Sequence, residues 1–183
     1  GQVVCPGFID LHSHSDSSIL VGRTRNNRSY LTQGCSTIVT GNCGGGKTDV
    51  GRYFGRLASR GAGTNVAHLL PHGSIRRRAM GASVDRAPTS EERARMRKLF
   101  DKGMREGAFG MSTGLIYAPG SFAKTEELVD CATVVAGYGG IYVSHIRGED
   151  SRLLGAVDEA IQIGERAGCP THISHFKASV PRN

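Results

Sequence analysis

The sequence contains no long hydrophobic run. Nowhere in its 183 residues does it reach the ~18 consecutive apolar residues that a membrane-spanning helix needs. Its N-terminus also lacks the basic and then apolar layout of a secretion signal. These absences predict a cytoplasmic protein with no membrane partner.

Cysteine pairs of the C-x-x-C kind are absent too, and the count of five cysteines is odd. A disulfide framework is therefore not expected. Four thiols are interpreted as small buried side chains, namely those of Cys5, Cys35, Cys131 and Cys169. Cys43 is different, because polar residues and glycines surround it, and we expect it to be exposed.

The formal charge of +7 raises the question of a nucleic-acid partner. The densest basic run is "IRRR" at 75–78, and no aromatic residues interleave with it as a base-stacking surface requires. We therefore expect no nucleic-acid partner. The run is interpreted as a solvated face or as an attraction for anionic substrates.

Glycine is abundant, at 26 residues, which favours many tight connections between strands and helices. Short β-branched runs alternate with stretches of helical period. Six strands are expected, at 7–12, 36–40, 65–70, 108–112, 141–145 and 171–175. This alternation implies a parallel α/β sheet, either doubly wound or closed into a barrel. The chain is shorter than the roughly 250 residues of a complete eightfold barrel.

Helix signals lie between the later strands. Thr89 and Glu92 form a capping box ahead of a helix that ends near Gly107. Further helices are expected at 49–59, after 125 and at 151–168. No internal repeat or linker divides the chain, which predicts a single domain.

Histidine and cysteine occur at the carboxyl ends of the expected strands, the edge at which parallel α/β folds bind ligands. His12 and His14 are two residues apart, so on an extended strand both imidazoles leave the same face, about 6.6 Å apart along the chain. His145 and His175 each end a β-rich run, and Cys43 follows the second strand. Together these residues predict a metal site.

A thiolate with several imidazoles suits Zn²⁺ better than magnesium or calcium. Zinc lowers the pKa of its water to about 7 and polarises carbonyl oxygens, which indicates metal-assisted hydrolysis. Two other histidines, His68 and His172, are interpreted as structural. His172 lies three residues before His175 and so on the other face of a regular strand. His72 stays undecided.

The segment 41–48 reads G-x-x-x-x-G-K-T, the pattern of a phosphate-binding P-loop, after a strand and before a helix. A P-loop enzyme also needs an aspartate at the end of an apolar strand to hold magnesium, and no later strand here ends in one. We interpret the glycines as a turn that presents Cys43. The role of Lys47 stays open.

Five segments together resemble the N-acyl-D-amino-acid deacylases (D-aminoacylases) of the amidohydrolase superfamily. They are "VVCPGFIDLHSHSD", "TQGCSTIVTGNCG", "GAFGMSTGLIYAPG", "YVSHIRGED" and "ISHFKAS". The resemblance implies a metal-dependent (β/α)8 TIM-type barrel that hydrolyses N-acyl-D-amino acids to a carboxylate and a free D-amino acid. Residues 1–183 are then expected to be a partial barrel holding strands 1 to 6. Strands 7 and 8 and a flanking β domain would lie outside this chain.

The resemblance also implies roles for individual residues. Cys43, His145 and His175 look like ligands of a tightly held zinc, and His12 and His14 like ligands of a second, weaker metal position. Tyr117 and Lys177 look like contacts to the substrate and its carboxylate. Arg147 and Glu149 are interpreted as a salt bridge beside the site. The general acid/base, an aspartate on the eighth strand, would lie outside the chain, so we expect the isolated chain to be inactive.

Three alternatives remain open. An amidohydrolase of cyclic amides, of the dihydroorotase or hydantoinase type, usually carries a carboxylated lysine on its fourth strand, and "GAFGMSTG" offers none. A P-loop nucleotide-binding module would require phosphate binding through Lys47. A metal-binding fragment without catalysis is the third. Acyl-group and side-chain preferences, the number of metals and the oligomeric state are not fixed by the sequence.

Overall fold

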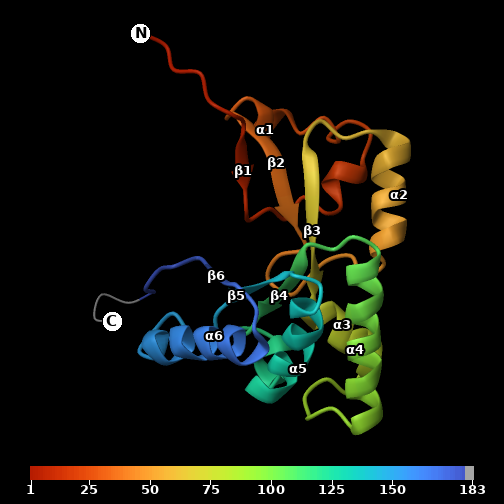
Figure 1. Ribbon diagram of the computed structural model, residues 1–183, viewed down its shortest axis with the longest axis vertical. Helices are drawn as coiled ribbons and strands as arrows, with labels where there is room; N and C mark the ends of the chain where they lie inside the picture. The colour runs from red at the N-terminus through yellow and green to blue at the C-terminus, as the bar shows by residue number, and fades with distance from the viewer. Residues whose placement is uncertain (180–183) are drawn as a thin grey trace.

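The computed structural model describes residues 1–179, which form a six-stranded parallel sheet (Figure 1). The strands lie side by side in sequence order, each parallel to the next. They are β1 (Phe8–Asp10), β2 (Cys35–Thr40), β3 (Asn65–Pro71), β4 (Gly110–Gly114), β5 (Ile141–His145) and β6 (Thr171–Ser174). All six predicted strands are present.

Helices connect successive strands and cover the outer side of the curled sheet (Figure 1). The longer ones are α2 (Val50–Arg60), α3 (His72–Met80), α4 (Ser90–Arg105), α5 (Thr125–Ala136) and α6 (Leu153–Ala167). Short elements η1 (Ser18–Leu20), α1 (Arg28–Leu31) and η2 (Gly120–Phe122) complete the connections. Sequential parallel strands with helices on one side are the geometry of a barrel rather than of a doubly wound sheet. Among residues 1–179, no helix combines the length and the apolar character that crossing a membrane requires.

The helix boundaries follow local signals in the sequence. The hydroxyl of Thr89 accepts a hydrogen bond from the Glu92 amide at 3.3 Å, and the Glu92 carboxylate accepts one from the Thr89 amide at 2.8 Å. The predicted capping box is therefore confirmed. At the end of α6, Gly168 takes the left-handed conformation with φ of 69°, as expected of a helix-terminating glycine.

Buried apolar side chains form three clusters, and the largest and the smallest of them lie on opposite faces of the sheet. The largest packs the helices against the sheet, with Phe100 of α4 and Met111 of β4 among its buried members. The smallest consists of Val39, Leu69 and Val143, from β2, β3 and β5. Val143 is two residues before His145 and so shares its face of β5. The smallest cluster therefore fills the barrel interior directly beneath the end of the sheet that carries His145.

Several expected elements differ in position by one or two residues, and the helices α3, η1, α1 and η2 were missed. β6 ends at Ser174, so His175 follows the strand that was expected to contain it. β1 ends at Asp10, so His12 follows the strand instead of lying in it, and β4 begins two residues later than expected. Helix α3 was not predicted. It begins directly after Pro71, the last residue of β3, so that no turn sequence marks its start.

The interpretation of the basic run as a solvated face is wrong for the first of its three arginines. Arg76 is fully buried, and its guanidinium donates hydrogen bonds to the Glu127 carboxylate, at 2.8 Å from Nε. The reason is that α3 turns this position inward against α5. Arg77 and Arg78 are exposed, as expected.

The prediction that four cysteines are buried holds for two. Cys131 and Cys169 are buried, whereas Cys35 is half-buried and Cys5 is exposed in the segment ahead of β1. Cys43, expected to be exposed, is buried, with 8% of its surface accessible. It is covered because the turn after β2 folds inward over the end of the sheet, where the histidines lie.

Candidate metal centre

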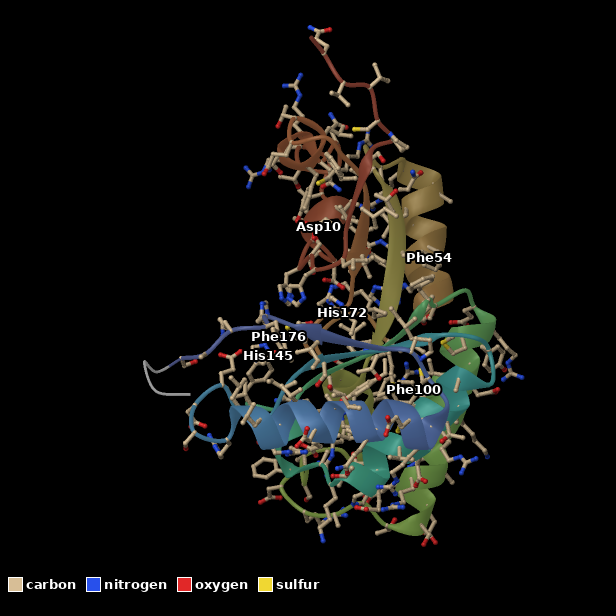
Figure 2. All side chains as sticks on the ribbon, turned by 60° about the vertical axis from the view of Figure 1, so that its left-hand side comes forward. Asp10, Phe54, Phe100, His145, His172 and Phe176 are labelled. Carbon is tan, nitrogen blue, oxygen red and sulfur yellow. The ribbon has the colours of Figure 1, made fainter. Side chains whose placement is uncertain are left out.

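The five predicted metal ligands come together at the carboxyl ends of β1, β2, β5 and β6. The Cys43 Sγ lies 3.4 Å from Nε2 of His12, 3.6 Å from Nδ1 of His145 and 3.7 Å from Nε2 of His175. Figure 2 labels His145, at the end of β5, and its ring lies 4.8 Å from that of His175, centre to centre. Side chains more than 130 residues apart in sequence thus surround one thiol.

These side chains form two overlapping groups. The ligand atoms of Cys43, His145 and His175 all lie within 4.8 Å of one another, and so do those of His12, His14 and Cys43. Cys43 belongs to both. In each group Cys43 is buried and one histidine is half-buried, whereas the other histidine, His14 or His175, is exposed. The arrangement therefore offers two adjacent positions that share the buried thiol, and each is open to solvent on one side.

The separations among Cys43, His145 and His175 suit zinc. Zinc binds sulfur at about 2.3 Å and imidazole nitrogen at about 2.0 Å, so neighbouring ligands of a tetrahedral ion are roughly 3.5 Å apart. The sulfur of Cys43 lies 3.6 and 3.7 Å from the nitrogens of His145 and His175. A sulfur with two imidazoles is also a donor set that zinc accepts. In the described part of the chain, the buried Nδ1 of His12 has no hydrogen-bond partner.

Two of these residues have unusual backbone conformations. Asn27, Cys43 and His175 are the non-glycine residues with positive φ in the described range, at 46°, 54° and 51°. Such a conformation costs of the order of 1 kcal/mol or more and is concentrated at functional sites. At Cys43 and His175 it directs the side chain of a post-strand residue back over the end of the sheet.

Burial sets the protonation of the cluster. It lowers the pKa of His12 to about 4, with further lowering by the neighbouring His175 and His14. Burial also lowers the pKa of His145, although the Glu149 carboxylate opposes this. The pKa of the Cys43 thiol is raised, first by burial. Near pH 7 and without a metal, the centre thus contains a protonated Cys43 thiol next to the neutral imidazoles of His12 and His145.

Glu149 plays a part that the sequence did not reveal. Its Oε1 lies 3.3 Å from Nε2 of His145, and its Oε2 contacts the ammonium of Lys177. The expected salt bridge between Arg147 and Glu149 is wrong, because the Arg147 guanidinium pairs with Glu159 at 2.8 Å. The loop after β5 turns Glu149 inward and Arg147 outward, and no periodic pattern in the sequence marks that turn.

The two predicted substrate contacts lie at the same place. The Tyr117 hydroxyl donates a hydrogen bond of 3.1 Å to the carbonyl oxygen of Cys43, and its ring packs 5.3 Å from the ring of His145, centre to centre. Lys177 reaches the carboxylate of Glu149. A cavity of about 390 Å³ opens here, and its lining includes His14, Cys43 and Tyr117.

The backbone of the loop 41–48 positions the Cys43 thiol and does not form a phosphate-binding cradle. The amide of Gly44 donates to the Ser112 hydroxyl at 3.0 Å, and that of Gly46 to the Ser74 hydroxyl at 3.3 Å. A phosphate cradle needs such amides to point at the ligand. Gly44 has φ of 69°, and a Cβ there would approach the Gly114 nitrogen at 2.9 Å. The glycines therefore allow close backbone contact.

Sequence reasoning also missed Asn42, whose side chain is fully buried. Its amide group donates to the Val39 carbonyl at 2.8 Å and lies 3.4 Å from the carbonyls of Leu11 and Ser13. It thereby joins the segment containing His12 to the turn containing Cys43.

The remaining histidines lie outside the cluster. His68 is fully buried, accepts a hydrogen bond from the Thr40 hydroxyl at 2.9 Å and donates one of 2.8 Å to the Lys47 carbonyl, in agreement with a structural role. The role of His72 was undecided from the sequence. Its Nε2 lies 2.9 Å from the buried Glu127 carboxylate, which also accepts hydrogen bonds from Arg76. His172 is half-buried within β6 (Figure 2).

Comparison with known proteins decides the family. The model of the amidohydrolase family matches residues 1–180. The chain belongs to the amidohydrolase family. Curated relatives of this amidohydrolase include a D-aminoacylase and an N-acyl-D-glutamate deacylase of Alcaligenes xylosoxydans xylosoxydans. Both are 36% identical to it, over 97% and 100% of this chain, and in each case over 41% of the relative. The amidohydrolase chain described here thus spans about two fifths of the length of these relatives.

Solved structures agree with the fold. An N-acyl-D-glutamate deacylase from Bordetella bronchiseptica, complexed with zinc and a phosphonate that mimics the tetrahedral intermediate, superposes with a TM-score of 0.93 at 34% identity. The match covers 97% of this chain and 42% of that one. A D-aminoacylase structure matches with a TM-score of 0.88 at 30% identity, over 94% and 41%. It is described as having a binuclear metal centre, with activation by one metal and attenuation by a second. The amidohydrolase barrel predicted from the sequence is therefore confirmed for the six strands present.

Proposed function

We propose that the whole protein containing this chain is a zinc-dependent N-acyl-D-amino-acid deacylase, which releases a carboxylate and a free D-amino acid. One observation carries the proposal. The ligand atoms of Cys43, His145 and His175 lie within 4.8 Å of one another at the carboxyl end of the sheet. The deacylases to which the chain is similar share this fold over the matched region, and one of them was solved with zinc.

Cys43, His145 and His175 would hold the tighter zinc, and His12 and His14 would complete a second, weaker position that shares Cys43. Zinc in such a site makes its water acidic and polarises a carbonyl oxygen, the two requirements of amide hydrolysis. The Cys43 carbonyl is fixed by the Tyr117 hydroxyl at 3.1 Å, which orients the turn that carries the thiol. Glu149 would orient His145 by accepting the proton on Nε2.

Lys177 and Tyr117 would bind the substrate. Lys177 places an ammonium two residues beyond His175, and a carboxylate on the substrate can compete with Glu149 for it. Tyr117 is partly exposed, and its ring packs against the ring of His145. Proton transfer to the leaving nitrogen also requires a general acid, and we assign it to an aspartate on the eighth strand of the whole protein.

The metal assignment is tested by measuring zinc content in the whole protein and in a Cys43→Ala variant, with Cys5→Ala as the matched control. Cys5 is an exposed thiol ahead of β1, so its loss should leave the metal in place. We expect tightly held zinc in the wild type and in the control, and its loss on dialysis of Cys43→Ala. Unchanged zinc in Cys43→Ala would contradict the ligand assignment. Preferential hydrolysis of N-acyl-D- over N-acyl-L-amino acids would test the substrate class.

Hydrolysis of cyclic amides has no support in the site. β4 reads "GMSTG" and contains no lysine that carbon dioxide could convert to a metal-bridging ligand. The linear amide is therefore the function that we propose.

A further inference from the structure

A second cavity lies beside the metal cleft. It has a volume of about 420 Å³ and lies between η1, the loop after β2 and the first two turns of α2. Its lining includes Gly46, Lys47, Thr48, Asp49, Arg52 and Arg56. Gly46 and Lys47 also line the cavity that opens over the metal cluster. The two cavities are therefore adjacent and share Lys47, the residue whose role the sequence left open.

The second cavity is surrounded by positive charge. Lys47, Arg52 and Arg56 all line it, and within residues 1–179 none of the three forms a salt bridge or a side-chain hydrogen bond. Asp49 is the single carboxylate in the lining, and it accepts a hydrogen bond from the Arg52 amide at 3.2 Å. The three positive side chains repel one another, and the single carboxylate cannot balance them all. An anion bound in the cavity would reduce that repulsion.

The side chains, and not the helix terminus, supply this attraction. The first amides of α2 are already engaged, since Gly51 donates to the Glu106 carboxylate at 3.0 Å and Arg52 to Asp49. Two hydrogen bonds hold the part of the cavity wall formed by Lys47 and Thr48. His68 donates to the Lys47 carbonyl at 2.8 Å, and Arg78 donates to the Thr48 hydroxyl at 3.2 Å. The arginines are one helical turn apart on α2 and so project from the same side.

We propose that Lys47, Arg52 and Arg56 form a binding site for an oxyanion group, a phosphate or a carboxylate, next to the metal centre. Guanidinium groups bind such anions through paired hydrogen bonds, and an ammonium adds a point charge. The cavity holds such a group together with several waters, because one water occupies about 30 Å³. The anion can be a free small molecule or a second acidic group on the substrate. The second source alone depends on the proposed deacylase function.

Phosphate binding to the zinc-loaded whole protein, followed by calorimetry, tests the site itself. The variant is Arg52→Gln/Arg56→Gln, and the matched control is Arg97→Gln/Lys98→Gln, which removes two charges from the exposed face of α4. We expect the first pair of changes to weaken phosphate binding roughly tenfold or more and the control to leave it unchanged. Equal affinities in variant and wild type, equal weakening in the control, or no phosphate binding by the wild type would overturn the proposal. None of these readouts requires turnover, so a failed deacylase assignment would be recognised separately.

Kinetics then distinguishes the two sources of the anion. If the site binds the substrate, phosphate competes with N-acyl-D-amino acids that carry a second carboxylate and not with neutral ones, and Arg52→Gln/Arg56→Gln raises KM for the former alone. If the site binds a free anion, phosphate binds in the presence of saturating substrate of either kind. Both outcomes support the oxyanion site and differ only in its occupant.

Discussion

Nε2 of His145 lies 3.3 Å from Oε1 of Glu149, while Nδ1 of the same ring lies 3.6 Å from the sulfur of Cys43. The imidazole is thus placed between a carboxylate and the ligand cluster. Because an ionised carboxylate can only accept hydrogen bonds, its proximity favours the tautomer with hydrogen on Nε2 and a free lone pair on Nδ1, directed at the cluster. Glu149 thus favours, even without a metal, the tautomer of His145 that could bind a metal through Nδ1.

Replacing Glu149 with alanine should therefore lower zinc affinity. Loss of a carboxylate that orients a ligating histidine typically costs 10 to 100-fold in metal affinity. Competition with a chelator of known affinity measures the change, and Glu149→Gln should give a smaller loss because its amide oxygen still accepts a hydrogen bond. The control is Glu159→Gln, which removes the partner of Arg147 instead. Equal losses in Glu149→Ala and Glu159→Gln would rule out an orienting role.

Zinc binding should release a proton from Cys43. Burial raises the pKa of the thiol above its ordinary value of 9, so near pH 7 it is protonated without metal and must lose that proton to ligate. His12 contributes no proton at this pH, because its pKa is lowered to about 4. Apparent zinc affinity should thus rise about tenfold per pH unit between roughly pH 7 and 9. Calorimetry in buffers of different ionisation enthalpy counts the protons directly.

Cys5→Ala serves as the control for that measurement, since an exposed thiol outside the cluster should leave the count unchanged. A pH-independent affinity over this range would mean that Cys43 is already a thiolate or does not bind the metal.

Lys177→Met should raise KM for N-acyl-D-amino acids with little loss of zinc. A hydrogen bond to a charged group contributes about 1.5 to 3 kcal/mol, so the rise should be tenfold or more if Lys177 binds the substrate carboxylate. Steady-state kinetics of the whole protein checks this, with Lys98→Met on the exposed side of α4 as control. If Lys177→Met loses its zinc while KM stays constant, Lys177 serves Glu149 and not the substrate.

What the sequence predicts well depends on local signals. β5 was predicted to its last residue, because an apolar run ends there in a histidine, and the capping box at Thr89 depends on two residues three apart. The candidate metal ligands could be predicted to converge because parallel strands end at one edge, so that strand ends meet even when they are distant in sequence. Glu149 and Asn42 were missed because their inward orientation is decided by loop backbones, for which no periodicity exists.

Arg76 is the sharpest case of that limit, since three consecutive arginines look alike in the sequence. Only the register of α3 against α5 decides that the first of them meets Glu127 in the interior. Burial alone would raise the pKa of Glu127, but hydrogen bonds from His72 and Arg76 outweigh it and lower the pKa. The carboxylate is thus charged in a dry environment and depends on Arg76.

Arg76→Met should accordingly destabilise the protein by about 3 to 5 kcal/mol, the usual cost of leaving a buried charge without its partner. The neighbouring Arg77→Met should change stability by less than about 0.5 kcal/mol, because Arg77 is exposed. Urea unfolding of the zinc-loaded protein compares the two. Arg76→Met/Glu127→Met should recover part of the loss, since it removes the stranded charge as well. If the double variant is no more stable than Arg76→Met, the loss comes from packing and from the hydrogen bonds of Arg76 to the carbonyls of Val84 and Arg86, and not from the charge of Glu127.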